Sequence, residues 1–266
     1  MSFIFSPTED SFLTIVTATY NSSKYIVKCI KSLQIACSNV SNFQMSHIVI
    51  DGCSTDGTSD LIKINSPSSQ IFFREKKGIY DALNYGISLV KSPYVMYLHS
   101  DDEIDVNFIK EMLFIINNNI LAEEVICYGT VDFINNISKI LFSRKPPFYM
   151  NIIQKYINII FHPNAIYSTS LEKRYPYNLN IGINADHEHI LEIAKQAKII
   201  RVPKARYRFR ISNESSTAKA IKIKTTFKLD KLPISVLKRY LNFFETKLLQ
   251  RSWLKLMSKY SYWNLK

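Results

Sequence analysis

Glycine is scarce in this chain, and the common glycine-rich phosphate-binding sequences are missing. The 266 residues include only six glycines. Neither GxGxxG nor GxxxxGK followed by Ser or Thr occurs, so neither a dinucleotide fingerprint nor a P-loop is supported. Four of the glycines fall within residues 52–86, which suggests a site there, because glycine is needed where backbone turns sharply or approaches a ligand. The alternative is that each one serves an ordinary turn.

Paired cysteines and long apolar runs are missing too, and we expect no secretory leader. The four cysteines are scattered without a CxxC pair, so we expect neither a zinc site nor a redox motif. Buried single thiols fit a reducing compartment. No apolar run reaches the about 18 residues of a membrane-spanning helix. The first segment, MSFIFSPTEDSF, has no basic or long apolar stretch, so we expect no signal peptide.

Acidic residues are few near the end of the chain, and the net charge is concentrated there. The formal charge is +12, and residues 217–266 hold 12 basic residues against two acidic ones. Residues 1–216 are nearly neutral, so we expect no nucleic-acid partner. Apolar residues interleave with the bases of 217–266, as in an amphipathic helical tail that binds an anionic membrane surface. The alternative is a helix packed on the body. We expect a cytoplasmic protein, peripheral on the inner face of the cell membrane.

Strand and helix patterns alternate along the first part of the chain. Runs of β-branched and aromatic residues predict strands at 12–20, 47–51, 70–74 and 94–100. Helical spacing follows three of them, at 23–36, about 58–64 and 78–91. This order predicts an α/β fold, with a mostly parallel sheet and helices on both faces. Later helices are expected at 107–118 and 185–197, and later strands at 125–134, 137–143, 198–203 and 205–211.

Polar clusters follow three of the predicted strands, where an open α/β sheet binds its ligands. These clusters are Thr17–Asn21, Asp51–Thr58 and His99–Asp102. The last contains adjacent carboxylates, which repel each other unless a divalent cation such as Mg²⁺ or Mn²⁺ lies between them. The alternative is an ordinary surface pair of acids.

Four separated segments together resemble family 2 glycosyltransferases. They are TIVTATYNSSKYI, IVIDGCSTDGTSDLI, KGIYDALNYGI and YVMYLHSDDEI, in that order within residues 12–105. A weaker resemblance continues through FHPNAIYSTSLEKRYPYN and INADHEHILEIAKQAKIIRVP to about residue 216. The chain looks most like bacterial enzymes of O-antigen, capsule and colanic-acid-type polysaccharide assembly. The resemblance implies the GT-A fold, a Rossmann-like mixed sheet.

The resemblance also implies a division of the chain. Residues 1–216 would form the catalytic domain, with a nucleotide-binding half at about 12–105 and an acceptor half at about 106–216. Residues 217–266 would form the basic tail outside it.

A nucleotide-sugar donor is implied by the same resemblance, commonly a UDP-sugar such as UDP-Glc, UDP-Gal or UDP-GlcNAc. The donor-binding residues carried over from the family are Thr17, Ala18, Tyr20, Asp51, Lys77, Asp81, Ser100 and Asp101. Of these, Asp51 would hydrogen-bond the base. Asp101 and Asp102 would hold Mn²⁺ or Mg²⁺, and which of them binds the metal stays open. The chain departs from the family at His99 and Lys76, where relatives often carry acids.

The later segments supply a catalytic base and acceptor contacts. Asp186 matches the family's base at the start of a helix, with Glu188 as the second choice. The alternative for Asp186 is an acid favoured by the helix dipole. His162, Glu188 and Arg208 would contact the acceptor. A structural role for the histidine and a solvated edge strand around Arg206, Arg208 and Arg210 are the alternatives.

These expectations combine into one reaction. An inverting, metal-dependent transferase would move a sugar from its nucleotide to a polyprenyl-diphosphate-linked saccharide during surface polysaccharide synthesis. A carboxylate would take the proton of the acceptor hydroxyl, and the cation would stabilise the leaving diphosphate. The alternative is a non-catalytic nucleotide- or glycan-binding protein, which the presence of Asp101, Asp102 and Asp186 disfavours.

Deletion of residues 217–266 is expected to release the protein from membranes. Each Lys or Arg near an anionic surface adds about 1 kcal/mol of attraction, and the segment contains 12 such residues. Sedimentation with membranes measures the effect, and unchanged pelleting of the shortened chain would refute the anchor.

Overall fold

The computed structural model describes residues 3–119, 124–149, 154 and 159–211. The helices are α1 (Ile26–Ser38), α2 (Thr58–Asn65), α3 (Ile79–Leu89), α4 (Phe108–Asn119), α6 (Thr169–Arg174) and α7 (Ala185–Ile193), with 3-10 turns η1 (Thr8–Asp10), η2 (His162–Asn164) and η3 (Leu179–Asn184). The strands are β1 (Leu13–Thr19), β2 (Met45–Asp51), β3 (Gln70–Phe73), β4 (Tyr94–Tyr97), β5 (Glu103–Ile104), β6 (Val125–Ile134), β7 (Ile140–Arg144), β8 (Ala165–Ser168) and β9 (Lys198–Arg210).

The chain divides into two compact units, Met1–Arg210 and Ile211–Lys266. The predicted tail, 217–266, lies outside the described residues. So does most of the stretch 148–160, whose apolar residues settle neither helix nor strand. The domain boundary at residue 216 and the two halves of the catalytic domain therefore stay predictions.

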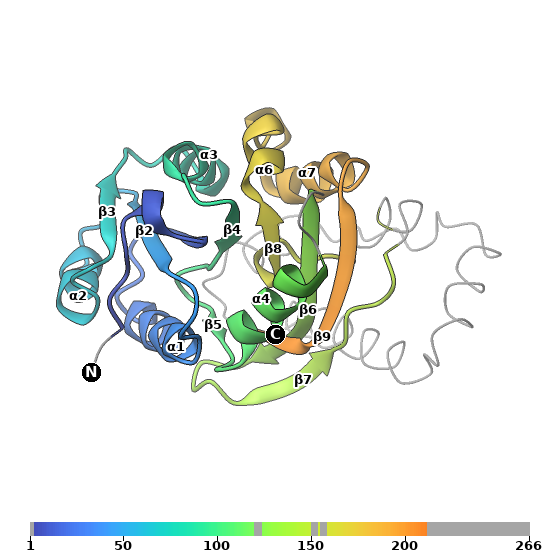
Figure 1. Cartoon of the computed structure of the whole chain (residues 1–266). Helices are drawn as coiled ribbons and strands as arrows, with labels where there is room; N and C mark the ends of the chain where they lie inside the picture. The colour runs from blue at the N-terminus through green and yellow to red at the C-terminus, as the bar shows by residue number, and fades with distance from the viewer. Residues whose placement is uncertain (1–2, 120–123, 150–153, 155–158, 212–266) are drawn as a thin grey trace, which may run out of the picture. The chain divides into compact units, whose positions relative to one another are not determined.

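Nine strands within the described ranges form one mixed sheet (Figure 1). Its order is β3-β2-β1-β4-β8-β6-β9-β5, and β7 pairs with β6. The first four strands along the chain pair in parallel. Strand β8 then runs antiparallel to both β4 and β6, so it joins the first half of the sheet to the second.

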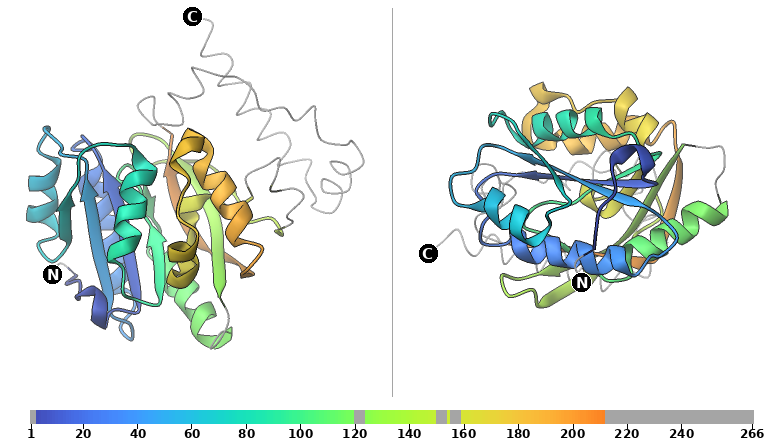
Figure 2. Two further views of the ribbon diagram at one scale, coloured as in Figure 1. Left: turned by 90° about the horizontal axis from the view of Figure 1, so that it is seen from above. Right: turned by 60° about the vertical axis from the view of Figure 1, so that its left-hand side comes forward.

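Helices cover both faces of this sheet (Figure 2). Helices α3, α6 and α7 lie on one face, and α1, α2 and α4 lie on the other. Strands β1 and β2 are buried almost throughout, which explains why their sequences are apolar runs without alternation. The predicted α/β class, with a mixed sheet covered on both faces, is confirmed.

Strand β9 differs from its prediction as two separate strands. It is one strand with a register shift, because Val202 lies opposite Gly129 whereas Arg206 lies opposite Thr130. The three extra residues bring the backbone of Ala205 against β6, where a Cβ at position 129 would lie 2.3 Å from its carbonyl oxygen. Glycine is therefore required at 129. Helix α7 also ends earlier than predicted, at Ile193.

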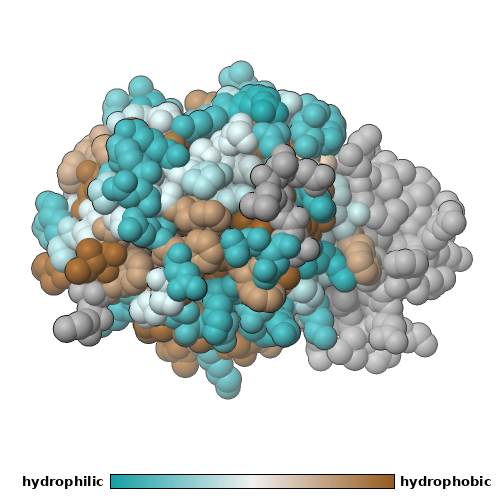
Figure 3. Space-filling model, in the orientation of Figure 1, coloured by the Kyte–Doolittle hydropathy of each residue, from teal (hydrophilic) through white to brown (hydrophobic). Residues whose placement is uncertain are grey.

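The surface of the described residues carries scattered apolar side chains. On the face shown in Figure 3, hydrophobic residues form separate patches among hydrophilic ones, as is normal for a folded domain. In the same ranges, no helix is both long enough and apolar enough to cross a membrane.

Candidate functional site

The carboxyl ends of β1 and β2 form a fixed corner at one edge of the sheet. Thr19 lies opposite Asp51, and the N–H of Gly52 donates to the carbonyl of Thr19 at 2.9 Å. The chain leaves the two strands through Asn21 (φ 49°) and Cys53 (φ 61°). Such backbone angles are uncommon outside glycine and persist where the surrounding structure imposes them. This is the edge at which the sequence predicts a ligand.

Two residues that are predicted to bind the nucleobase lie at this corner, one buried and one exposed. Asp51 is buried, and its carboxylate accepts hydrogen bonds from the backbone and hydroxyl of Ser54 at 3.1 and 2.5 Å and from the hydroxyl of Ser59 at 2.7 Å. Asp51 therefore shapes the turn, and a bound nucleobase would have to share the Asp51 carboxylate oxygens with these two serines. Tyr20 is 42% exposed, and the Lys76 ammonium lies 3.8 Å from the centre of its ring.

Two other residues that are predicted to contact the nucleotide-sugar donor form hydrogen bonds with residues of the chain itself. Thr17 is buried, and its hydroxyl hydrogen-bonds the ring of His47 at 3.0 Å, so it lies beneath the corner. Asp81 accepts two hydrogen bonds from Arg74, at 2.7 and 3.0 Å. These bonds hold the pKa of the Asp81 carboxyl below its usual value. Of the remaining predicted residues, Ala18 is half-buried, Lys77 is exposed and Ser100 is buried.

The two adjacent carboxylates after β4 have different surroundings. Asp102 is buried, and its oxygens accept hydrogen bonds from the backbone of Arg210 at 2.7 Å and the hydroxyl of Tyr207 at 2.8 Å. Burial, with the Asp101 charge as the next cause, raises the pKa of the Asp102 carboxyl well above its usual range. Asp101 is half-buried, and its carboxylate accepts no hydrogen bond from a described residue. Asp101 is therefore the carboxylate that is open to a ligand.

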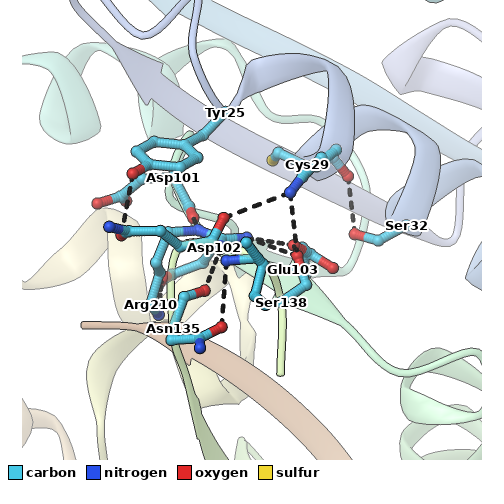
Figure 4. Close-up of polar contacts among 12 residues, drawn as sticks. Tyr25, Cys29, Ser32, Asp101, Asp102, Glu103, Asn135, Ser138 and Arg210 are labelled. Atoms are coloured by element: carbon cyan, nitrogen blue, oxygen red, sulfur yellow. Dashed lines mark hydrogen bonds and ion pairs between the residues drawn. The ribbon is translucent and has the colours of Figure 1, made fainter. Parts of the chain in front are cut away.

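A buried arginine from the end of β9 holds this loop in place (Figure 4). The Arg210 side chain pairs with the carboxylate of Glu103 and donates to the backbone carbonyls of Asp101 at 2.7 Å and Asn135 at 2.5 Å. The ring of Tyr25 lies 4.7 Å from its guanidinium. Because Arg210 is 1% exposed, these partners compensate a charge that is costly to bury.

The same loop contains a group of side chains that fits a metal ion. Ligand atoms of His99, Asp101 and Asp102 all lie within 4.8 Å of one another. The Nε2 atom of His99 is buried without a hydrogen-bond partner. Burial lowers the pKa of this imidazole and favours its neutral form, which is the form that coordinates metals. One nitrogen and two carboxylates make a donor set suited to a divalent cation.

Asp186, the predicted base, lies near this loop although it comes from the second half of the chain. It occupies the first turn of α7, and burial, followed by the charge of Asp186, raises the pKa of the Tyr80 hydroxyl on α3. The charge of Asp186 also acts on the ring of His99. Glu188 is exposed two residues further along α7. Sequence reasoning missed Tyr80, whose only signal is its place three residues before the buried Leu83.

A buried polar network lies under the site. Glu172 is 1% exposed and accepts a hydrogen bond from Tyr97 at 2.6 Å and contacts the ring of His189 at 2.9 Å. Tyr177 bonds the ring of His162, which is 2% exposed. The structure thus favours the structural alternative for His162. The ring of His189, on α7, thus pairs with a buried acid and does not lie on the helix surface.

The alternating arginines of β9 are paired with acids of the chain. Arg206 donates to Asp132 at 2.7 Å, and Arg208 donates to Asp105 at 2.8 Å. Strand β9 lies between β6 and β5, so the alternative of a solvated edge strand is not supported. An acceptor substrate that bound Arg208 would have to share the Arg208 guanidinium with Asp105. This acceptor contact stays a prediction.

Solved structures share this fold at low sequence identity. The crystal structure of S. aureus TarS 1-349 in complex with UDP matches with a TM-score of 0.59 and 18% identity, covering 88% of this chain and 73% of that one. The mannosyltransferase PcManGT from Pyrobaculum calidifontis, in complex with GDP-Man and Mn²⁺, matches with a TM-score of 0.55 and 16% identity over 83% and 64%. The fold class is therefore GT-A, as the sequence predicts.

The family follows from the sequence itself. The model of Glycosyl transferase family 2 matches residues 14–176, and the chain belongs to this family. TuaG of Bacillus subtilis, described as a putative teichuronic acid biosynthesis glycosyltransferase, is 30% identical over 95 residues, which are 34% of this chain and 36% of that protein. Glycosyltransferase GlyG of Streptococcus pneumoniae is 29% identical over 104 residues, covering 38% and 33%. The matches thus span about a third of each relative.

Replacement of Arg210 by Met is expected to lower the free energy of unfolding by about 3–5 kcal/mol, because it leaves the buried Glu103 carboxylate without its cation. Urea denaturation measures the loss. The matched control is Arg174→Met, which removes an exposed pair with Glu124 and should change stability little. The double variant with Glu103→Gln should regain part of the loss. Equal stability of the two single variants would contradict the role of Arg210.

Proposed function

We propose that this protein transfers a sugar from a nucleoside-diphosphate sugar to an acceptor hydroxyl, with inversion at the anomeric carbon and with a divalent metal ion. The observation that carries the proposal is the convergence of Asp101 and Asp186 around His99. The first acid follows β4 and the second begins α7, 85 positions later in the sequence. Direct displacement needs a base on the acceptor side and charge stabilisation on the leaving-group side, and these two acids supply separate groups for the two tasks.

The leaving-group side is formed by the loop after β4. Asp101 and Asp102 would hold the cation, with Asp101 presenting the open carboxylate. When bound, a divalent cation neutralises the charge that develops on the departing diphosphate. Arg210 fixes the loop backbone through the carbonyl of Asp101, so the carboxylate is oriented before any ligand arrives.

The acceptor side is formed by α7. Asp186 would take the proton from the acceptor hydroxyl as it attacks, since an unactivated hydroxyl is a poor nucleophile. The hydroxyl of Tyr80, on which the charge of Asp186 acts, is proposed to hold this carboxylate. The stacking of Tyr80 on Tyr177, with ring centres 5.4 Å apart, anchors Tyr80 on the buried network.

The donor is proposed to be a UDP-sugar such as UDP-Glc, UDP-Gal or UDP-GlcNAc. The exposed ring of Tyr20 at the β1–β2 corner offers a face on which a nucleobase can stack. Asp51 ends β2, Lys77 and Ser100 follow β3 and β4, and Asp81 lies in the first turn of α3. Structures of TarS with UDP and with UDP-GlcNAc support this choice, since their fold is the same.

The acceptor is proposed to be a polyprenyl-diphosphate-linked saccharide at the cytoplasmic face of the membrane, in the synthesis of a surface polysaccharide such as O-antigen, capsule or exopolysaccharide. Support comes from the description of TuaG in teichuronic acid biosynthesis. The basic residues of 217–266 would bring the enzyme to this membrane surface.

Replacement of Asp186 by Asn is expected to lower kcat by about 10²–10⁴-fold, the usual contribution of a general base, while UDP still binds. Mass spectrometry of the products of a donor screen with a lipid-diphosphate acceptor and Mn²⁺ measures transfer, and calorimetry measures UDP binding. Glu192→Gln is the matched control, an exposed acid of the same helix. Loss of transfer in Glu188→Gln with turnover retained in Asp186→Asn would move the base to Glu188.

Replacement of Tyr80 by Phe removes only the hydroxyl that is proposed to bond Asp186. A hydrogen bond to a charged group is worth about 1.5–3 kcal/mol, so kcat should fall at least about tenfold. The donor KM should stay nearly constant, because the ring still stacks on Tyr177. Tyr85→Phe on the same helix is the control and should leave both constants unchanged. A raised KM with unchanged kcat would assign Tyr80 to donor binding instead.

A further inference from the structure

The loop after β4 contains one histidine whose surroundings differ from those of a structural histidine. Its ring is 24% exposed beside the two carboxylates. The Nδ1 atom lies 3.9 Å from the nearer oxygen of Asp102, which is too far for a hydrogen bond. The Nε2 atom is buried with no partner. Neither ring nitrogen of His99 therefore hydrogen-bonds within the described residues.

His47 shows what a histidine in the core of this protein looks like. Its Nε2 bonds the hydroxyl of Thr17 at 3.0 Å, and its Nδ1 bonds the hydroxyl of Ser69 at 2.7 Å. Buried polar atoms are normally satisfied in this way, and an exception calls for an unseen partner. The missing partner of His99 has to fit an imidazole that lies beside two carboxylates.

We propose that His99 is itself a metal ligand, so that the site binds its cation through one imidazole nitrogen together with the carboxylate oxygens. The inference rests on the proposed function, because it concerns the same cation. All three ligand atoms lie within 4.8 Å of one another, close enough to share one ion. The donor set then combines nitrogen with oxygen.

This donor set selects among metals. Mg²⁺ demands oxygen ligands and retains its waters, whereas imidazole suits first-row transition metals. A carboxylate at position 99 would give an all-oxygen set in which Mg²⁺ and Mn²⁺ compete more evenly. The structure therefore assigns this protein a preference for Mn²⁺ over Mg²⁺ that depends on His99.

The rival role for His99 is a direct hydrogen bond to the donor's phosphate or ribose, without a bond to the metal. That role also explains a ring without a partner, but it predicts no nitrogen in the coordination shell. A measurement on the bound metal itself separates the two roles without any assay of sugar transfer.

The test is pulsed electron paramagnetic resonance of Mn²⁺ bound to the full-length protein with UDP. Coupling of ¹⁴N to the metal is expected, and it should become ¹⁵N coupling when the protein is made with ¹⁵N-histidine. His99→Asp should lose the coupling and lower the preference for Mn²⁺ over Mg²⁺ at least about tenfold in competition titrations. His187→Asn should keep both, since that ring bonds the carbonyl of Gln154.

The isotope experiment uses the unaltered chain, so it stands even where a variant fails to fold. Mn²⁺ and UDP binding without histidine nitrogen coupling would overturn the metal role of His99 and leave the proposed function intact. UDP binding without any Mn²⁺ binding would overturn this inference together with the metal dependence. Failure to bind UDP at all would overturn the proposed function itself.

Discussion

The buried cation of Arg210 is the interaction on which the candidate site depends. Arg210 is the last residue of β9. Its backbone N–H donates to the carboxylate of Asp102, which lies 108 positions earlier in the loop after β4. Burying a guanidinium is unfavourable unless every donor finds an acceptor, and here the acceptors are Glu103 and two backbone carbonyls. The loop after β4 consequently has one arrangement in which this charge is compensated. That arrangement directs Asp102 inward and leaves Asp101 outward.

A second connection joins the two halves of the sheet on the opposite side of the site. Tyr80 and Asp186 link α3 to α7, and Tyr177 joins them to the buried acid Glu172. Since β8 runs between β4 and β6, helix α6, which follows β8, brings Glu172 to the hydroxyl of Tyr97 at the end of β4. The network is almost closed to water, so its hydrogen bonds are stronger than on a surface and it resists rearrangement. The positions of Asp186 and of the loop after β4 are therefore set by two separate groups of contacts.

The sequence predicts the first half of the molecule better than the second, for a physical reason. Each parallel strand ends in the residues that form the site, so a local pattern such as YVMYLHSDD contains both the strand and its function. In the second half, the partners lie far apart along the chain. Nothing near Arg206 or Arg208 reveals that Asp132 and Asp105 will pair with them, and Glu172 in SLEKR resembles a surface acid. The different surroundings of Asp101 and Asp102 likewise come from Tyr207 and Arg210, which no local pattern connects to them.

The histidine at position 99 also changes the charge of the site. An acid there would stand beside Asp101 and Asp102 and within reach of the charge of Asp186, and four carboxylates that close repel one another. The pKa of Asp102 is already raised by burial and by the charge of Asp101. A neutral imidazole adds a ligand without adding to that repulsion. The loop therefore needs less positive charge to balance its carboxylates before a ligand binds. Arg210 supplies that charge from within the protein.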